Sequence, residues 1–299
     1  MEKRRKRLLV TGASGFLGWN ACVHCRDSWN VLGVFHRHPF ELQGVALLRA
    51  DLTQWSEAKQ VLREARPDVI LHTAAASQPN FCQTAPERTR KINVEASCNL
   101  AGFAADRNIP FVFTSSDLVF DGKSPPYREE DPVAPLSVYG EQKVMAENGV
   151  LERNPLAAVC RLSLLFGNRA PASENVLESM VGVLRGGGQL RLFTDEFRTP
   201  LSVRDAVKGL LTVLGSVSGI LHLGGAERIS RYEFGRLLAE FLGEGHDRIV
   251  PCLRKDVPMP APRPHDVSLD SSRAFSMGFK PGTLRGELEH LLREGDRWV

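Results

Sequence analysis

A tyrosine and a lysine four residues apart, in the stretch SVYGEQK from Ser137 to Lys143, have the side chains needed to transfer a proton. Four residues is close to one helical turn, so Tyr139 and Lys143 would project from the same face of a helix. An ammonium beside a phenol favours the phenolate and lowers a tyrosine pKa that is normally about 10. Such a pair also arises by chance, as a half-buried tyrosine near a solvated lysine, so the surrounding elements must decide between the two interpretations.

A glycine-rich turn follows the first apolar run of the chain. In TGASGFLG, three glycines stand at three-residue intervals directly between an expected strand and an expected helix. Glycines there allow a tight turn and a close approach of pyrophosphate, while the helix N-terminus offers free N–H groups to anionic oxygens. Glycines also end strands and cap helices without any function, but this position favours a dinucleotide site. The GxxGxxG spacing resembles that of the short-chain dehydrogenase/reductase superfamily. We therefore expect the cofactor to contact Gly12, Ser14, Gly15, Phe16, Leu17 and Gly18.

Apolar runs alternate with amphipathic stretches through the first half of the chain. We expect strands in RLLVTG, NVLGVF, DVILHTAA, IPFVFTSS and LAAVCRLSLLFG, and helices that begin near Gly15, Gln54 and Glu87. Strands separated by helices indicate βαβ units and a parallel sheet that is covered on both faces. The fold class is therefore α/β.

The pattern changes beyond Gly167, where glycine-rich and proline-rich segments appear. VRDAVKGLLTVL is typical of a helix, and a last helix is expected near Leu284 to Leu292. We expect a Rossmann-type doubly wound parallel sheet formed by residues 1–168 and 201–224. A smaller C-terminal substrate domain would be formed by residues 169–200 and 225–299.

Composition excludes several classes of protein. The 299 residues are 42% hydrophobic and 24% charged, with a net charge of +3, which does not indicate a nucleic-acid partner. The basic run from Lys3 to Arg7 is interpreted as a solvated tail. No apolar run is long enough to span a bilayer or to act as a secretory signal, so we expect a cytoplasmic protein without a membrane partner. Six scattered cysteines, CVHC among them, are interpreted as reduced packing residues, and no metal site is expected.

The end of the second strand bears on the choice of cofactor. An NAD-binding fold usually places a carboxylate there for the ribose 2′-hydroxyl. Here the strand ends in VFHRHP, and no acid appears until Glu41. Arg37 could instead meet a 2′-phosphate with its planar fork of donors, although a basic surface loop is the alternative. We predict NADPH, with NADH as the second choice.

A longer stretch narrows the resemblance. SSDLVFDGKSPPYREEDPVAPLSVYGEQKVMAE, with RPHDVSLDSSR downstream, is similar to the extended short-chain reductases of the dTDP-4-dehydrorhamnose reductase family. That family is related to the regulatory beta subunit of methionine adenosyltransferase, whose PPYREED type of loop the sequence matches. The resemblance implies an NADPH-dependent reductase of a nucleotide-linked 4-keto-6-deoxy sugar. The alternative is a non-catalytic NADP-binding regulatory subunit, and a homodimer stays open.

Residue roles follow from that resemblance. Tyr139 would donate the proton, Lys143 would tune Tyr139 and hold the nicotinamide ribose, and Ser116 rather than Ser115 would orient the carbonyl. The other residues expected at the cofactor are Asp51 and Leu52 near the adenine, the backbone of Ala74, Ala75 and Ala76, and Asn93. The residues expected at the substrate are Ser116, Asp117, Tyr139 and Leu164.

Two positions depart from the family pattern. Leu118 stands where rhamnose-forming reductases typically have tyrosine and nucleotide-sugar dehydratases have glutamate, and Leu164 replaces the tryptophan of RTSW. Leucine cannot transfer protons, which disfavours a dehydratase. The loss of aromatic groups predicts a substrate that differs from the rhamnose precursor.

Overall fold

A sheet of seven parallel strands forms the centre of the molecule, in a computed structural model that describes residues 4–168, 170–173 and 175–293. The strand order is β3-β2-β1-β4-β5-β6-β11, which confirms the predicted doubly wound, Rossmann-type fold. The strands are β1 (Arg7–Thr11), β2 (Asn30–Phe35), β3 (Val45–Arg49), β4 (Val69–His72), β5 (Phe111–Ser116), β6 (Ala158–Leu162) and β11 (Gly219–Leu223). The edge strand β3, which the apolar runs did not single out, contains only half-buried and exposed residues.

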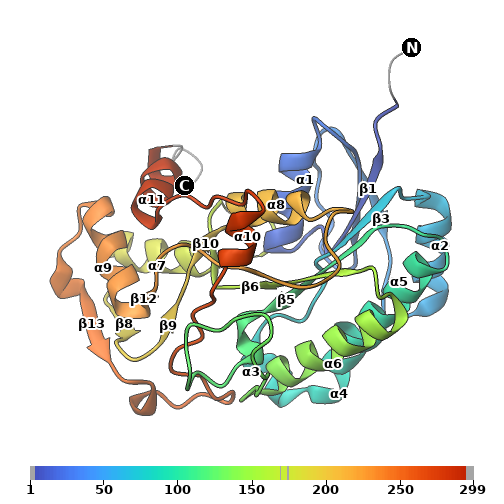
Figure 1. Ribbon diagram of the computed structural model, residues 1–299. Coiled ribbons are helices and arrows are strands. Elements are labelled where there is room, and N and C mark those ends of the chain that lie inside the picture. Colours follow the sequence, from blue (N-terminus) through green and yellow to red (C-terminus); the bar gives the residue numbers. More distant parts are fainter. Residues whose placement is uncertain (1–3, 169, 174, 294–299) are drawn as a thin grey trace.

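Helices cover both faces of this sheet, as Figure 1 shows with α1 and α8 above it and α5 and α6 below. One face carries α1 (Phe16–Cys25), α8 (Val203–Thr212) and α10 (Ser272–Ser276); the other carries α2 (Trp55–Ala65), α5 (Ala96–Ala105) and α6 (Val138–Arg153). Successive side chains of a strand point to opposite faces, so Leu8 and Val10 join one core and Leu9 the other. The inner strands β4 and β5 are buried at every residue, because helices cover the sheet on both faces.

Several short helical segments stand where one helix was expected from about Glu87. Two proline-initiated helices, α3 (Pro79–Thr84) and α4 (Pro86–Arg90), come first. A π-helical turn, η1 (Lys91–Glu95), then joins α4 to α5. Proline suits the first turn of a helix because its missing N–H has no intrahelical partner there.

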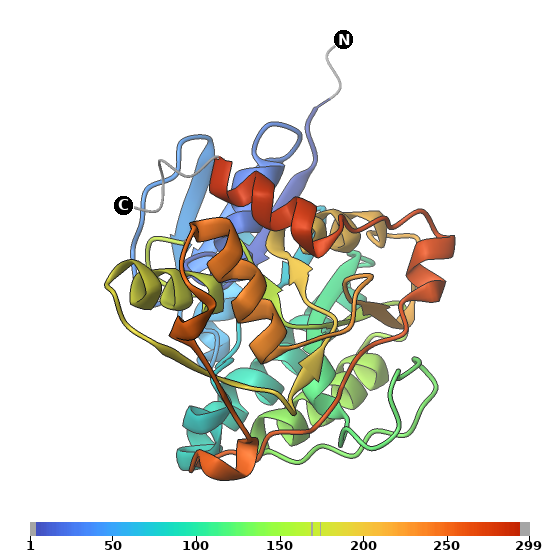
Figure 2. The ribbon, with the colours of Figure 1, turned by 90° about the vertical axis from the view of Figure 1, so that its left-hand side faces the viewer.

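A second lobe lies on the left in Figure 1 and faces the viewer in Figure 2. Its helices are α7 (Val176–Arg185), α9 (Arg231–Leu242) and α11 (Leu284–Arg293), with short turns η3 (His246–Arg248) and η4 (Arg254–Asp256). Short strands pair as β7 (Leu165–Phe166) with β10 (Leu201–Ser202), β9 (Phe197–Arg198) with β12 (Ile229–Ser230), and β8 (Leu190–Phe193) with β13 (Ile249–Cys252). Phe166, Leu177, Phe234 and Leu288 lie in one core that these helices share.

LAAVCRLSLLFG was expected as one strand, but it divides into β6 and β7, which belong to different sheets. The chain leaves the central sheet after Leu162, and Ser163 and Leu164 lie between the two strands. The division into two domains at residues 168, 201 and 224 stays a prediction.

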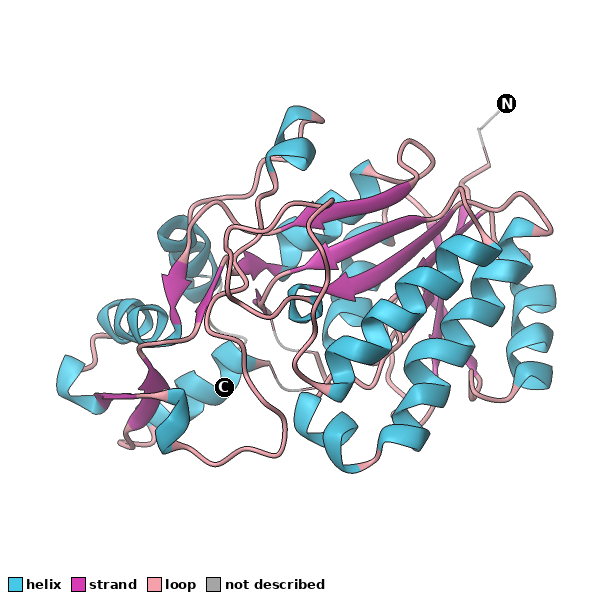
Figure 3. Ribbon diagram, turned by 60° about the horizontal axis from the view of Figure 1, so that its bottom comes forward, coloured by secondary structure: helices cyan, strands magenta, loops and turns pink. Residues whose placement is uncertain are grey.

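The carboxyl ends of β1, β4 and β5 face the second lobe. Figure 3 shows the strands, in magenta, running toward the loops that join the two parts. In the described residues, no helix has the length and apolar character that a membrane crossing needs. The cysteines are buried, as expected of packing residues, and burial raises the pKa of the Cys22 and Cys160 thiols to about 12.

Candidate functional site

A cleft of about 780 Å³ opens at the carboxyl ends of the parallel strands, between the sheet and the second lobe. In open α/β sheets this is the edge at which ligands bind. The structure brings nearly all residues predicted from the sequence to this cleft. They are Gly12, Ser14, Gly15, Phe16, Leu17, Gly18, Arg37, Asp51, Leu52, Ala74, Ala75, Ala76, Ser116, Asp117, Tyr139, Lys143 and Leu164.

The three glycines of the turn differ in how much space a side chain would have. Gly12 has φ +67°, and a Cβ there would lie 2.7 Å from the Ala74 backbone. A Cβ on Gly18 would lie 2.2 Å from the Gly12 carbonyl oxygen, so both positions exclude a side chain for packing reasons. Gly15 meets only one atom, at 3.2 Å, and it precedes α1, where no side chain caps the first turn. The N-terminus of α1 therefore presents free N–H groups and a partial positive charge to the cleft.

The far end of the cleft is basic. Arg37 follows β2 and lines the cleft together with His36 and His38. His36 Nε2 lies 3.7 Å from Asp51 Oδ2. Burial would raise the pKa of Asp51, but hydrogen bonds from Thr53 and the nearby charges of His36 and Arg37 lower it. The Asp51 carboxylate is thus occupied by Thr53 and His36.

Asn93 does not line the cleft. It sits in η1 with a 1% exposed side chain, where its Oδ1 accepts from the Ala76 N–H at 2.8 Å. Its amide nitrogen donates to the Ala76 carbonyl and to Gln142 of α6. The predicted direct cofactor contact is therefore replaced by a structural one, because Asn93 lies behind Ala76 and fixes its backbone.

Tyr139 and Lys143 lie on one face of α6, as their spacing predicts, and both are buried. The Lys143 ammonium donates to the Thr114 carbonyl at 2.8 Å and lies 5.8 Å from the Tyr139 ring centre. Burial lowers the pKa of Lys143 to about 8, although the Glu147 carboxylate opposes this.

The predicted lowering of the Tyr139 pKa is wrong for this arrangement. Burial raises that pKa above 10, the Ser116 hydroxyl opposes the rise, and the negative charge of Asp117 adds to it. Spacing alone suggested that Lys143 would dominate, but Lys143 is engaged by Thr114 and desolvation of the phenolate is the larger effect. Tyr139 consequently holds its proton at neutral pH.

The two serines at the end of β5 point to different partners. Ser115 donates to the buried carboxylate of Glu147, away from Tyr139. Ser116 accepts from the Leu118 N–H at 3.2 Å and donates to Asp117 Oδ1 at 3.1 Å. Its hydroxyl also lies close enough to Tyr139 to affect that phenol. Both serines line the cleft, but the Ser115 hydroxyl is bonded to Glu147, so the geometry favours Ser116 as the hydroxyl that acts beside Tyr139.

Asp117 is held in a buried ion pair. Its Oδ2 lies 3.0 Å from Arg198 Nη1 and accepts from the Ser163 hydroxyl at 3.2 Å. Both members of the pair are 5% exposed or less. Asp117 supplies the counter-charge of a buried guanidinium, so removing the Asp117 carboxylate would leave Arg198 buried and unpaired on this side.

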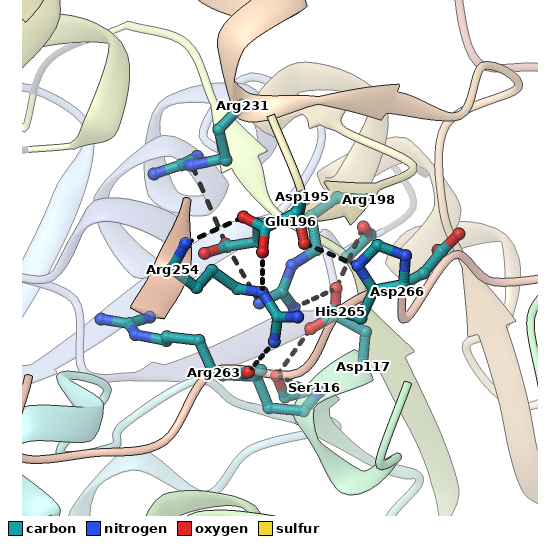
Figure 4. A network of polar contacts seen from close by, with 12 residues as sticks. Ser116, Asp117, Asp195, Glu196, Arg198, Arg231, Arg254, Arg263, His265 and Asp266 are labelled. Atoms are coloured by element: carbon teal, nitrogen blue, oxygen red, sulfur yellow. Dashed lines mark hydrogen bonds and ion pairs between the residues drawn. The ribbon is translucent and has the colours of Figure 1, made fainter. Parts of the chain in front are cut away.

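A cluster of charged side chains from the second lobe forms the opposite wall, and the sequence analysis missed it (Figure 4). Glu196 lies 3.4 Å from Arg198 and 3.9 Å from Arg231, and the charges of Arg198, Arg231 and Arg263 lower the pKa of Glu196 despite its burial. With Asp117, three guanidinium groups face two carboxylates, so this wall is positive. In the described part of the chain, Arg198 Nε, Arg231 Nη1 and Arg263 Nε are buried without a hydrogen-bond partner.

Only one weak signal pointed to this wall. Arg263 is the first residue of the RPHDVSLDSSR segment. Arg198 lies in the short strand β9 and Arg231 is the first residue of α9, and neither belongs to a recognised motif. Leu118 and Leu164 also line the cleft, on the side of Ser116 and Asp117. They give this part of the wall an apolar surface in place of a phenol and an indole.

Known proteins resemble this chain along nearly its whole length. A family model described as RmlD substrate binding domain matches residues 6–296. Methionine adenosyltransferase 2 subunit beta of Pongo abelii is 32% identical over 286 residues, covering 91% of this chain and 83% of that protein. The probable low-salt glycan biosynthesis reductase Agl14 of Haloferax volcanii is 31% identical over 288 residues, covering 94% of this chain and 96% of that protein. The crystal structure of dTDP-4-dehydrorhamnose reductase from Bacillus anthracis in complex with NADP superposes with a TM-score of 0.87 at 21% identity, covering 97% of this chain and 100% of that one.

Proposed function

The chain belongs to the family of the RmlD substrate binding domain, and we propose that it reduces a keto group of a nucleotide-linked sugar with a nicotinamide cofactor. The preferred substrate is a 4-keto-6-deoxy sugar. One observation carries this proposal: Ser116, Tyr139 and Lys143 meet in one cleft with the glycine turn. The 31% identity to the probable glycan biosynthesis reductase of Haloferax volcanii supports the same class of reaction.

The cleft fits a dinucleotide. Gly12 and Gly18 admit no Cβ, so the turn can approach a pyrophosphate closely, and α1 directs N–H groups at it. Arg37 would take a 2′-phosphate, since the nearby Asp51 carboxylate is already engaged by Thr53 and His36. A bound nicotinamide would supply the hydride.

The residues of the chain would supply the proton and the polarisation. The Ser116 hydroxyl, which donates to Asp117 Oδ1 in the structure, would turn to donate to the substrate carbonyl oxygen, on which negative charge develops as the carbon is reduced. Tyr139 would then give that oxygen its phenolic proton, and its raised pKa keeps the proton available at neutral pH. Lys143 stands beside Tyr139 as an ammonium that stabilises the phenolate left behind.

The surroundings of Asp117 disfavour a dehydratase reaction. That reaction would need an acid and a base at Asp117 and Leu118, by resemblance to the Thr-Asp-Glu of dehydratases. Asp117 is ion-paired with Arg198, and Leu118 has no titratable group. Reduction without loss of water is the chemistry that these side chains support.

The arginines of the second lobe support a phosphorylated substrate. Arg231 and Arg263 line the cleft in a wall that carries excess positive charge, and each has one buried nitrogen without a hydrogen-bond partner in the described residues. Guanidinium groups bind phosphate oxygens through paired hydrogen bonds. We propose that they hold the diphosphate of the nucleotide sugar and leave its keto group beside Ser116 and Tyr139.

The direct test is turnover. Purified protein is mixed with NADPH and a panel of dTDP-linked 4-keto-6-deoxy sugars, and absorbance is followed at the nicotinamide band. We expect oxidation of NADPH, slower with the rhamnose precursor than with a neighbouring keto-sugar because Leu118 and Leu164 lack aromatic contacts. No oxidation with any sugar would refute the proposal.

A second function has one observation in its favour, which is the 32% identity to methionine adenosyltransferase 2 subunit beta. In that role the chain would bind the cofactor and associate with a larger enzyme without turnover. Gel filtration with a methionine adenosyltransferase separates the two functions. A stable complex that persists in Tyr139→Phe, together with no turnover, would favour the regulatory subunit.

A further inference from the structure

A buried network of side chains lies next to Lys143, and its central ion pair does not line the cleft. Its centre is Glu147, one helical turn beyond Lys143 on α6 and 2% exposed. Arg161 of β6 donates to both carboxylate oxygens of Glu147, at 3.0 and 2.8 Å. Ser115 of β5 donates to one of the same oxygens. Neither Glu147 nor Arg161 lines the cleft, so any effect on a ligand must pass through other residues.

Ser115 connects this network to the reacting groups. Its neighbours in β5 are Thr114, whose carbonyl accepts from Lys143, and Ser116, whose hydroxyl lies beside Tyr139. The Ser115–Glu147 hydrogen bond therefore joins α6 to β5 close to the residues that each element contributes to the cleft. A shift of the strand end would move the Lys143 acceptor and the Ser116 hydroxyl together.

Glu147 is also the anionic group that acts on Lys143. The ammonium is surrounded by Tyr139 on its own helix, by the Cys82 thiol of α3, and by neutral His72 of β4, whose pKa burial lowers to about 3. The ring of Phe113 in β5 lies 4.8 Å away. Among these groups Glu147 is the carboxylate, and it favours the charged form of Lys143 against the cost of burial.

We propose that Glu147 is a positioning residue for the reaction, clamped by Arg161 and Ser115 so that it fixes the end of β5 and keeps Lys143 charged. The inference rests on the proposed function for its role in turnover, but its effect on Lys143 is measurable by cofactor binding alone. Arg161 in turn is held by His222 of β11 and by the Glu129 carbonyl, so the clamp spans the last three strands of the sheet.

The charge on Lys143 is tested by the pH dependence of NADPH binding. Dissociation constants are measured by fluorescence titration between pH 6.5 and 9.5. In the unmodified protein, affinity should fall as pH rises through about 8, where Lys143 loses its proton. The double variant Glu147→Gln/Arg161→Gln removes both charges together, so that neither is left buried and unpaired. In this double variant, the affinity for NADPH should begin to fall at a pH that is lower than in the unmodified protein by roughly one unit or more.

Two further variants make this result specific. Lys143→Met should abolish the pH-dependent loss, which ties it to Lys143. Ser115→Ala leaves the ion pair intact and frees the strand end, so it should weaken NADPH binding roughly two- to tenfold at every pH. Ser115→Thr keeps a hydroxyl and should restore binding.

An unshifted pH profile in the double variant, or unchanged binding in Ser115→Ala, would overturn the inference. If the double variant changes the urea midpoint but not the pH profile of NADPH binding, the ion pair only stabilises the fold, and this result would also overturn the inference. The proposed function fails separately, when no keto-sugar is reduced although NADPH binds with the expected pH profile.

Discussion

Lys143 offers a quantitative test of the electrostatics of the site, because its burial should cost stability. Burial lowers its pKa from 10.5 to about 8. At about 1.4 kcal/mol for each pH unit, this drop corresponds to about 3 kcal/mol that the folded protein loses by holding a charged lysine. Below pH 8 the lysine is charged in both states and the whole cost is present. Between pH 8 and 10.5 the folded protein gives up the proton first, so its stability rises and the cost disappears.

Lys143→Met removes this cost while filling a similar volume. We expect the variant to be more stable than the unmodified protein at pH 7, by about 3 kcal/mol less about 1 kcal/mol for the hydrogen bond that Thr114 loses. By pH 10.5 the difference should have moved by about 3 kcal/mol in favour of the unmodified protein. Urea unfolding at pH 7, 8.5 and 10 gives the difference, and the exposed Lys280→Met is the matched control.

The same variant should bind NADPH more weakly, so that stability and function change in opposite directions. A stability difference that stays constant from pH 7 to 10 would refute the reasoning. It would mean that burial of Lys143 carries no charge penalty, and that the pKa of the ammonium is set by something other than desolvation.

Three other changes test single residues. Tyr139→Phe should lower turnover about 10²- to 10⁴-fold and leave NADPH binding nearly intact, and undiminished turnover would exclude Tyr139 as the acid. Arg37→Ala should weaken NADPH binding roughly ten- to a hundredfold with little effect on NADH, measured by fluorescence titration. An unchanged preference would remove Arg37 from the 2′-phosphate. Arg231→Gln should raise KM for the nucleotide sugar by about tenfold with kcat nearly unchanged, whereas a fall in kcat alone would contradict a role in substrate binding.

The cofactor half of the cleft was predictable from sequence for a physical reason. Gly12 and Gly18 are required by backbone approaches of 2.7 and 2.2 Å, so no other residue can stand there and the pattern is visible in one sequence. Tyr139 and Lys143 lie on one helix, where spacing alone decides which side chains share a face. Local rules therefore placed these residues correctly.

The arginine wall of the cleft was not predictable in the same way. Arg198, Arg231 and Arg263 come from a two-residue strand, a helix start and a loop, and only the tertiary fold brings them to one wall. The prediction that the Tyr139 pKa is lowered was wrong for a related reason. The direction of the pKa shift depends on desolvation by neighbours distant in sequence, which outweighs the adjacent Lys143. Asn93 was predicted to contact the cofactor, but in the π-helical turn η1 it lies behind Ala76 and binds the Ala76 backbone.

Hydride transfer to the sugar is the central claim, and isotope labelling tests it most directly. The protein is incubated with NADPH carrying deuterium at both C4 positions of the nicotinamide and with a dTDP-linked 4-keto-6-deoxy sugar, and the product is analysed by mass spectrometry and proton NMR. We predict a product that contains one deuterium, located at C4 of the sugar, and none in the Tyr139→Phe reaction over the same time. A sugar recovered without deuterium, while NADPH is shown to be bound, would contradict the account.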